Sequence, residues 1–357
     1  MFRALILAAA VMAAPALAQA QAPRPVTTYK APRMADGHPS LEGVWSNAAI
    51  TRLERKASHG PGLVLTEAQV RRIEARNQAL IDLGDKPTDP DLKVTDLPAD
   101  CSGGRGTDCN YNAAWTDPGS VVMRVQGEGR NGFITTPADG RVPMRPEAVA
   151  GAFGARLPPG LRASDNPESR ALGERCLLSF GTSSGPVMTP GLYNNTYQFV
   201  QTRDQVAIVV EMVHDARIIR LGARHLSAKI RPWMGDSIGW WEGDTLVVET
   251  TNYHPQQSFR GASEHLKVTE RFTPVAEGRM HYGFWVEDPT VFRQPWGGEY
   301  EFSRITGQIY EYACHEGNYG LANILSGARE EDRSGVQTAP TNIDQRAAQG
   351  EEGEEEG

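Results

Sequence analysis

The chain has 357 residues, of which 39% are hydrophobic, and a formal net charge of −8 at pH 7. Nine acidic residues and two arginines lie in residues 330–357, so the remaining body carries a net charge of only −1. Such a nearly neutral body lacks the basic footprint that binds nucleic acid or anionic lipid, and we expect neither as a partner. We predict that residues 330–357 form a disordered acidic tail, because they are polar and lack aromatic side chains.

The N-terminus has the features of a secretory signal peptide. Arg3 precedes a short apolar run, and small residues follow it up to Ala18. The run is shorter than the roughly 20 apolar residues that a membrane-spanning helix needs, and no later segment is apolar enough to span a bilayer. We therefore predict a signal peptide over residues 1–18, a linker over 19–40, and a periplasmic or secreted mature protein.

Four cysteines follow, at positions 101, 109, 176 and 314. In an oxidising compartment an even number of cysteines favours disulfide formation, although four cysteines allow three pairings. We favour Cys101 with Cys109, which closes a short glycine-rich loop, and Cys176 with Cys314, which ties a mid-chain segment to a late one. The chain has no C-x-x-C spacing, which makes metal binding by these thiols the weaker alternative.

One segment has the pattern of a helix. Thr66 and Gln69 form a capping box, apolar residues then recur near helical spacing, and Gly84 ends the segment. We predict a single N-terminal helix over residues 66–84 as an elaboration of the domain that follows it.

Beyond residue 130 the pattern changes to short apolar runs separated by Gly, Pro and Asp, which is typical of strands. Regular short strands predict an antiparallel barrel or sandwich. We therefore expect a mainly β protein, with one β-rich domain over residues 41–329. The predicted strands are 131–136, 141–144, 197–202, 205–213, 216–221, a strand ending at 240–241, 245–251, 265–273, 279–287, 300–305 and 308–314.

Two resemblances follow from longer stretches of sequence. The segments LEGVWSN (41–47), WMGDSIGWWEGDTLVVETTNY (233–253) and IYEYACHEGNYGLANILSGARE (309–330) are similar to a large set of exported bacterial proteins of no assigned activity. That similarity implies a shared fold and assigns no catalytic residue. Gly43-Val44-Trp45 also resembles the G-x-W motif of lipocalin-like barrels, in which a late arginine covers the tryptophan at one barrel end. Arg304 or Arg329 would have that role here.

Several glutamates occupy predicted strands. In 245–251 side chains alternate between two faces, so Glu249 shares a face with Val247, and Glu211 and Glu270 share faces with other valines. If these faces point inward, burial and mutual repulsion would raise a carboxyl pKa toward the range useful for acid/base catalysis. We predict that Glu249 points into a cavity with at least one of Glu211 and Glu270. The alternative is that these glutamates face solvent or pair with Lys and Arg across strands.

Further site residues come from histidines, aromatics and arginines. His214 follows a strand and His315 follows Cys314, so we add both to the three glutamates as catalytic candidates. Aromatic side chains would stack on a flat apolar ligand, and arginines would partner the carboxylates. The predicted ligand-binding residues are Trp240, Trp285, Tyr253, Arg217 and Arg271.

Two other motifs suggest a metal site and a nucleophilic serine, but their sequence context contradicts both. Glu211, His214 and His225 are a conceivable metal-ligand trio, but positions i and i+3 of a strand face opposite ways, and no H-E-x-x-H occurs. Residues 181–185 match G-x-S-x-G, yet prolines follow where the nucleophile elbow needs a helix. We therefore expect no metal and no cofactor.

Together these patterns predict an exported lipocalin-like protein that acts on a small aromatic or lipid-like molecule. The first hypothesis is cofactor-free acid/base chemistry of the hydrolase, lyase or isomerase type. The alternative is a non-catalytic periplasmic protein that binds a small ligand. An enzyme needs an acid and a base at one pocket, whereas a binder needs an apolar cavity with few polar groups.

Overall fold

The computed structural model describes residues 22–23, 25, 27–84, 119–149, 162–179, 185–191 and 194–335. The predicted signal peptide, the Cys101 and Cys109 pair, most of the G-x-S-x-G motif and most of the acidic tail lie outside these residues. Among the described residues, no helix is long and apolar enough to cross a membrane.

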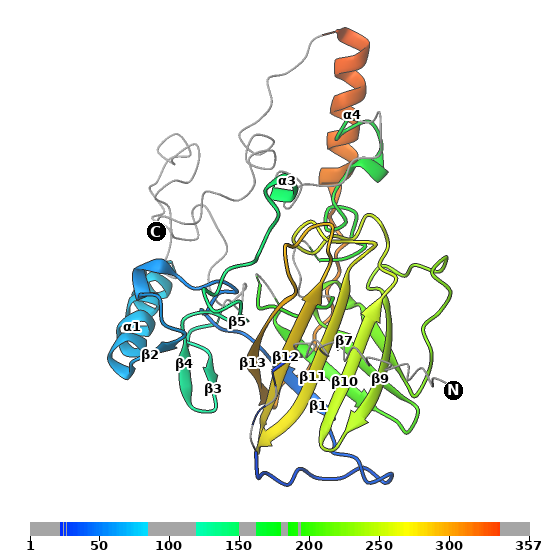
Figure 1. Ribbon diagram of the computed structural model, residues 1–357. Coiled ribbons are helices and arrows are strands. Elements are labelled where there is room, and N and C mark those ends of the chain that lie inside the picture. The colour runs from blue at the N-terminus through cyan, green and yellow to red at the C-terminus, as the bar shows by residue number, and fades with distance from the viewer. Residues whose placement is uncertain are drawn as a thin grey trace, which may run out of the picture.

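The centre of the molecule is a closed β-barrel (Figure 1). Ten strands of the described chain form one sheet, and nine of them close on themselves because β1 pairs with both β6 and β13. The predicted mainly β fold with a barrel is confirmed. The barrel strands are β1 (Gly43–Ser46), β6 (Thr196–Gln201), β7 (Gln205–Val210), β8 (Ala216–Leu221), β9 (Asp236–Glu242), β10 (Thr245–Thr251), β11 (Lys267–Ala276), β12 (Arg279–Glu287) and β13 (Trp296–Ile305).

The barrel departs from a simple antiparallel meander at one point. β8 and β9 pair in parallel, so residues 222–235 must return along the barrel as a crossover segment. β9 then turns tightly into β10 at Gly243, whose φ of 61° is in the left-handed region. This is the hairpin expected from the G-W-W-E-G-D-T sequence.

The barrel wall is uneven next to β13. β1 pairs only with residues 303–305 of β13, and β5 (Ile134–Thr136) pairs with Gly297 and Gly298 instead. β12 occupies one edge of β13, and β1 and β5 share the other, which leaves no edge for residues 308–314. The predicted strand over 308–314 is therefore wrong, and that over 141–144 reduces to a single bridge at Met144.

The barrel interior is filled by side chains that alternate along the strands. Each large aromatic side chain removed from water stabilises the fold by about 1.5–3 kcal/mol, so this cluster dominates the core. The fully buried aromatic residues on the inner faces include Tyr197, Phe199, Phe272, Tyr282, Phe284, Trp296, Tyr300 and Phe302.

One barrel end is closed by the G-x-W sequence. The Arg304 guanidinium lies 5.7 Å from the centre of the Trp45 ring, and the Trp45 indole N–H donates to the Leu41 carbonyl at 2.9 Å. Gly43 leaves room for this arginine, because a Cβ there would lie 2.7 Å from Arg304 Nη2. The expectation of a late arginine over the tryptophan is confirmed for Arg304, whereas Arg329 lies on α4.

Residues 27–40, predicted as linker, pack against the same end. The Arg33 guanidinium forms two hydrogen bonds with Asp244, of 2.6 and 2.8 Å, and the His38 ring stacks on Trp241 at 4.8 Å. The conspicuous hairpin sequence thus serves as a docking point for the N-terminal segment.

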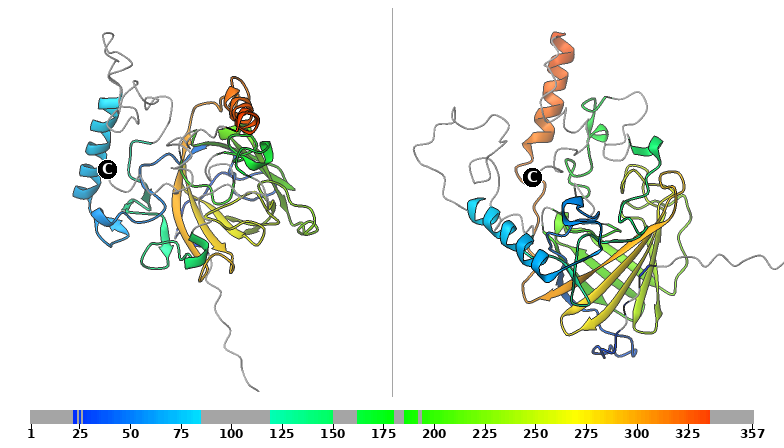
Figure 2. Two further views of the ribbon diagram at one scale, coloured as in Figure 1. Left: turned by 90° about the horizontal axis from the view of Figure 1, so that it is seen from above. Right: turned by 60° about the vertical axis from the view of Figure 1, so that its left-hand side comes forward.

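Helices and a small sheet stand outside the barrel (Figures 1 and 2). Helix α1 (Glu67–Gly84) begins at the predicted capping box, with Thr66 N–H donating to Gln69 Oε1 at 2.9 Å. It lies beside a small sheet of β2 (Val64–Leu65), β4 (Glu128–Arg130) and β3 (Arg124–Val125). The short helix α3 (Pro146–Val149) follows, and α4 (Tyr319–Ser334), which the sequence pattern did not predict, projects away from the barrel and includes residues 330–334.

Candidate functional site

A buried ion pair spans the barrel interior between β8 and β11. The Arg217 guanidinium donates two hydrogen bonds to the Glu270 carboxylate, and both side chains are at most 2% exposed. Tyr282 on β12 donates its hydroxyl to Glu270 Oε1 at 2.8 Å, whereas Arg217 Nε has no hydrogen-bond partner among the described residues. Two of the ten predicted site residues therefore meet inside the barrel.

A loop from outside the sheet completes this polar set. Residues 185–191, which we term the plug segment, place Val187 and Met188 in the core with at most 1% exposure. The Met188 N–H donates to the Tyr282 hydroxyl oxygen at 3.2 Å, and the Met188 carbonyl accepts from Tyr300. Asn47 donates its amide to the same carbonyl at 3.1 Å.

We refer to Asn47, Arg217, Glu270, Tyr282 and Tyr300 as the interior polar network. Burial raises the pKa of Tyr282 and of Tyr300 well above the ordinary value, and the nearby Glu270 charge adds to the effect. Both hydroxyls therefore remain protonated over the physiological range.

A third predicted site residue that reaches the interior is Tyr253, which lies after β10. It is fully buried in the same core, and burial again raises its pKa, with Glu270 contributing. Arg217 and Tyr253 are thus the predicted ligand-binding residues that reach the interior.

Glu249 lies on the opposite face of the sheet from Glu270. β10 and β11 pair with Val248 opposite Glu270, so these two share the inner face and Glu249 points outward. The prediction that Glu249 shares a cavity with Glu270 is wrong. The prediction assumed that the face Glu249 shares with the apolar Val247 is the inner one. Val247 is fully buried although it lies on the outer face, so its burial does not identify the barrel interior.

Glu249 belongs instead to a charged cluster on the outer wall. His225 of the crossover segment contacts Asp236 Oδ2 at 2.9 Å with Nδ1 and Glu249 Oε1 at 3.2 Å with Nε2. Lys267 lies 2.8 Å from Glu249 Oε2. Burial raises the pKa of Glu249, but the hydrogen bond and charge of Lys267, with His225, outweigh burial and lower it. The cluster fastens the crossover segment to the barrel.

Three further predicted ligand-binding residues also lie on the outer face. Arg271 donates to Glu242 Oε2 at 2.9 Å, and the Trp240 indole donates to the other oxygen of the same carboxylate at 3.0 Å. Trp285 is opposite Thr269 on the outer side of β12 and packs against Gly297, where a Cβ would lie 2.6 Å from the ring. None of the three faces the lumen.

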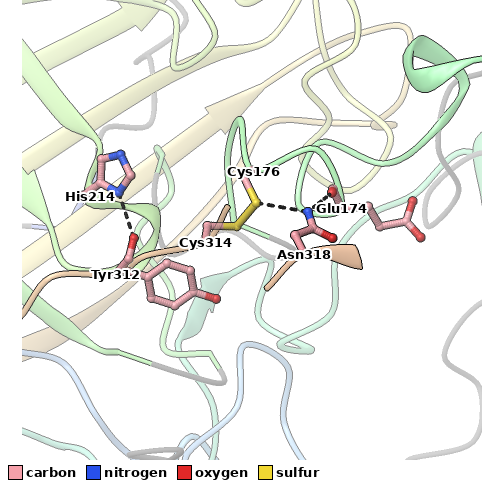
Figure 3. Close-up of a disulfide and its surroundings, with 6 residues drawn as sticks. All are labelled: Glu174, Cys176, His214, Tyr312, Cys314 and Asn318. Carbon is pink, nitrogen blue, oxygen red and sulfur yellow. Dashed lines mark hydrogen bonds between the residues drawn. A yellow bond between two sulfur atoms is a disulfide. The ribbon is translucent and has the colours of Figure 1, made fainter. Parts of the chain in front are cut away.

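The remaining candidates are Glu211 and His214 at the β7–β8 turn and His315 after the disulfide; Figure 3 shows His214 and the disulfide. Cys176 and Cys314 are bridged, which confirms that pairing. The His214 ring contacts the Tyr312 carbonyl at 3.0 Å, and His214 and Val213 both have left-handed backbone, with φ of 52° and 61°. His315 is exposed on the loop after the disulfide.

Two carboxyl groups flank this turn. Glu211 is 6% exposed and accepts from Asn194 at 2.8 Å through Oε1, while Oε2 has no hydrogen-bond partner among the described residues. Burial raises the pKa of Asp215 to about 6, and its Oδ2 likewise has no partner in the described part of the chain. Within the residues that the structure describes, no group of three or more His, Cys, Asp or Glu side chains is arranged to hold a metal ion.

Comparison with known proteins adds little to this geometry. No protein-family model and no curated protein matches the chain. A crystal structure of a mutant of the fluorescent protein UnaG is similar over 31% of this chain and 72% of that chain, with 14% sequence identity and a TM-score of 0.21. At these values the likeness assigns no residue a role, and the barrel is established by its own strand pairing.

Sequence reasoning missed three members of the interior polar network and the plug segment. Strand parity groups Tyr282 with Met280 and Phe284, and Tyr300 with Phe302, but it does not say that these faces are the inner ones. No local pattern marks Asn47 or Met188, because their roles depend on contacts between segments far apart in the chain.

Proposed function

We propose that this protein binds a small, largely apolar molecule inside the barrel, in the place that Val187 and Met188 now fill. The single observation that carries this is the interior polar network, in which Asn47, Tyr282 and Tyr300 form hydrogen bonds with the Met188 backbone of the plug segment in addition to those they form within the barrel. A closed barrel with a few convergent polar groups in an apolar interior is compatible with small-ligand binding.

The ion pair within this network supports a binding role over a purely structural one. Desolvation of two charges offsets most of their attraction, so a buried pair contributes little stability compared with apolar side chains of similar volume. The role that we assign to Arg217 and Glu270 is to orient the Tyr282 hydroxyl. Arg217 holds the Glu270 carboxylate in place, and that carboxylate accepts the Tyr282 hydroxyl hydrogen, which leaves the Tyr282 oxygen to face the ligand.

We further propose that binding takes place outside the cytoplasm, in the periplasm or after secretion. The disulfide between Cys176 and Cys314 supports this, because such bonds persist mainly in oxidising compartments. The signal-peptide pattern of residues 1–18 points the same way.

Extraction of retained molecules tests the proposal. The mature protein is purified from the cells that produce it, denatured, and the extract is examined by mass spectrometry. We expect one class of apolar molecule at near-stoichiometric amounts, strongly reduced in Tyr282→Phe. Tyr310→Phe, at a residue 71% exposed, is the matched control and retains the molecule. An extract of the unaltered protein that is no richer than a blank would contradict the proposal.

Acid/base catalysis is a second candidate function. Its residues would lie at the β7–β8 turn, in place of Glu249. With a pKa of about 6, Asp215 is partly protonated near neutral pH, as a general acid must be. Its Oδ2 and Glu211 Oε2 are both buried without a hydrogen-bond partner among the described residues. A screen of ester and lactone substrates tests this: hydrolysis abolished by Asp215→Asn and unchanged by Asp204→Asn, whose side chain is 71% exposed, supports catalysis. Activity that survives Asp215→Asn would contradict it.

A further inference from the structure

A group of cationic side chains lies at the end of the barrel opposite the hairpin at Gly243, beside the loop that follows β10. We refer to Arg175, Arg231 and His254 as the cationic cluster. All three side chains are partly buried. Trp233 packs on the His254 ring, with the ring centres 3.9 Å apart, and thereby holds that ring in place.

Both arginines are fastened to residues that flank His254 in the chain. Arg231 donates through Nη1 to the Tyr253 carbonyl at 3.1 Å, and Arg175 donates through Nη1 to the Gln256 side-chain oxygen at 3.4 Å. Burial, and then the charges of Arg175 and Arg231, lower the pKa of His254. The two guanidinium groups therefore lie close enough to His254 to act on it, and the ring is mostly neutral at neutral pH.

No acid in the described part of the chain neutralises either guanidinium. Arg231 donates to one further group, the Glu264 carbonyl at 3.0 Å, so the acceptors of both arginines are neutral oxygens. The carboxylate of Glu174, the residue before Arg175, pairs instead with Arg170 at 2.6 Å. Two partly buried positive charges without a counterion are unfavourable, and an anion that contacts both would offset that cost.

His254 adds a directed hydrogen-bond donor to this positive charge. The backbone N–H of Gln256 donates to Nδ1 of His254 at 3.2 Å. Because Nδ1 accepts, the neutral ring carries its hydrogen on Nε2. Together with the guanidinium N–H groups that the Tyr253, Glu264 and Gln256 oxygens do not use, the cluster offers donors and positive charge.

We infer that the cationic cluster binds an oxyanion group of a small molecule: a carboxylate, sulfate or phosphate. The fixed fork of a guanidinium matches two oxygens of such a group, and its charge strengthens each hydrogen bond. The inference is independent of what the barrel interior binds.

The oxyanion has two sources of the same chemistry. It is either a free anion or the head group of a molecule whose apolar part lies at this end of the barrel. The loop that carries His254 adjoins the plug segment, since a Cβ at Gly185 would lie 3.6 Å from Gln257 Nε2. A head group at the cluster would therefore lie beside the segment that fills the barrel.

Titration of simple anions into the full mature protein tests the inference. Sodium sulfate, phosphate and acetate are added at neutral pH and constant ionic strength, and the His254 ring resonances are followed by NMR after assignment with His254→Gln. We expect at least one oxyanion to shift them saturably in the millimolar range or below, and the neutral dimethyl sulfone to leave them unshifted. Octyl sulfate that binds more tightly than sulfate identifies a head group as the source, and equal affinity identifies a free anion; either supports the inference.

Two variants check that the guanidinium charges are responsible. Arg175→Gln and Arg231→Gln each remove one charge and keep an amide donor, and each should weaken oxyanion binding by about tenfold or more; whichever of the two folds suffices. Arg203→Gln is the matched control and should leave the affinity unchanged, because Arg203 is 81% exposed and already pairs with Asp204 at 3.1 Å. His254 resonances that respond to no oxyanion, or that respond equally to dimethyl sulfone, overturn the inference, as does an affinity that neither arginine variant changes.

Discussion

Removing the carboxylate of Glu270 should destabilise the fold strongly. Glu270 is 0% and Arg217 2% exposed at the side chain, so Glu270→Leu leaves an unpaired guanidinium inside the barrel and deprives Tyr282 of its acceptor. Breaking a buried pair from one side costs about 3–5 kcal/mol. In a chain of this size that corresponds to a decrease in Tm of roughly 10 °C.

The double variant Arg217→Met/Glu270→Leu separates the cost of an unpaired charge from the value of the pair. Apolar side chains of similar volume should restore stability to within about 1 kcal/mol of the unaltered protein. Urea unfolding followed by tryptophan fluorescence and circular dichroism gives the free energies, and the double variant should be more stable than Glu270→Leu by about 2–5 kcal/mol.

An exposed pair provides the control. Arg33 and Asp244 are 42% and 41% exposed, so replacing Asp244 by Leu should change stability by at most about 1 kcal/mol. If Glu270→Leu is as stable as the unaltered protein, or the double variant as unstable as the single one, the charge is not confined in a dry interior and the reasoning is refuted.

Three other predictions concern the rest of the molecule. The pKa of Glu249 is lowered in the folded state, so its contribution is present above the ordinary value of 4.5 and is lost as pH falls through the folded pKa; Glu249→Gln should flatten the loss of unfolding free energy below pH 4.5 in acid titrations. Cys314→Ser should lower the unfolding free energy by about 5 kcal/mol, because the bridge closes a separation of 138 residues, and reducing the unaltered protein with dithiothreitol should reproduce that value in urea melts. Gly43→Ala should lower Tm by several degrees, since its φ of 132° is one that L side chains rarely adopt and its Cβ would displace the Arg304 guanidinium, whereas Gly307→Ala, with only Ile305 at 3.8 Å, should not; equal effects would show that the G-x-W glycine is not constrained.

Much of the fold could be predicted because it depends on local patterns. Period-two alternation identified most barrel strands, and the Thr66 and Gln69 capping box placed the start of α1. Where residues 308–314 alternate in the same way, no strand forms, because one edge of β13 is paired with β12 and the other is shared by β1 and β5. Strand propensity is local, but the availability of a pairing edge is not.

The site shows the same division. The sequence by itself determined the β class and the hairpin before Thr245, because each follows from neighbouring residues. The Cys176 to Cys314 bridge was the favoured one of three pairings, and the structure decided it together with the choice of Arg304 over Trp45. Only the tertiary structure decided which strand face is the interior. Both faces of β10 carry fully buried valines, so alternation sorts Glu249 from Val248 without saying which side is enclosed.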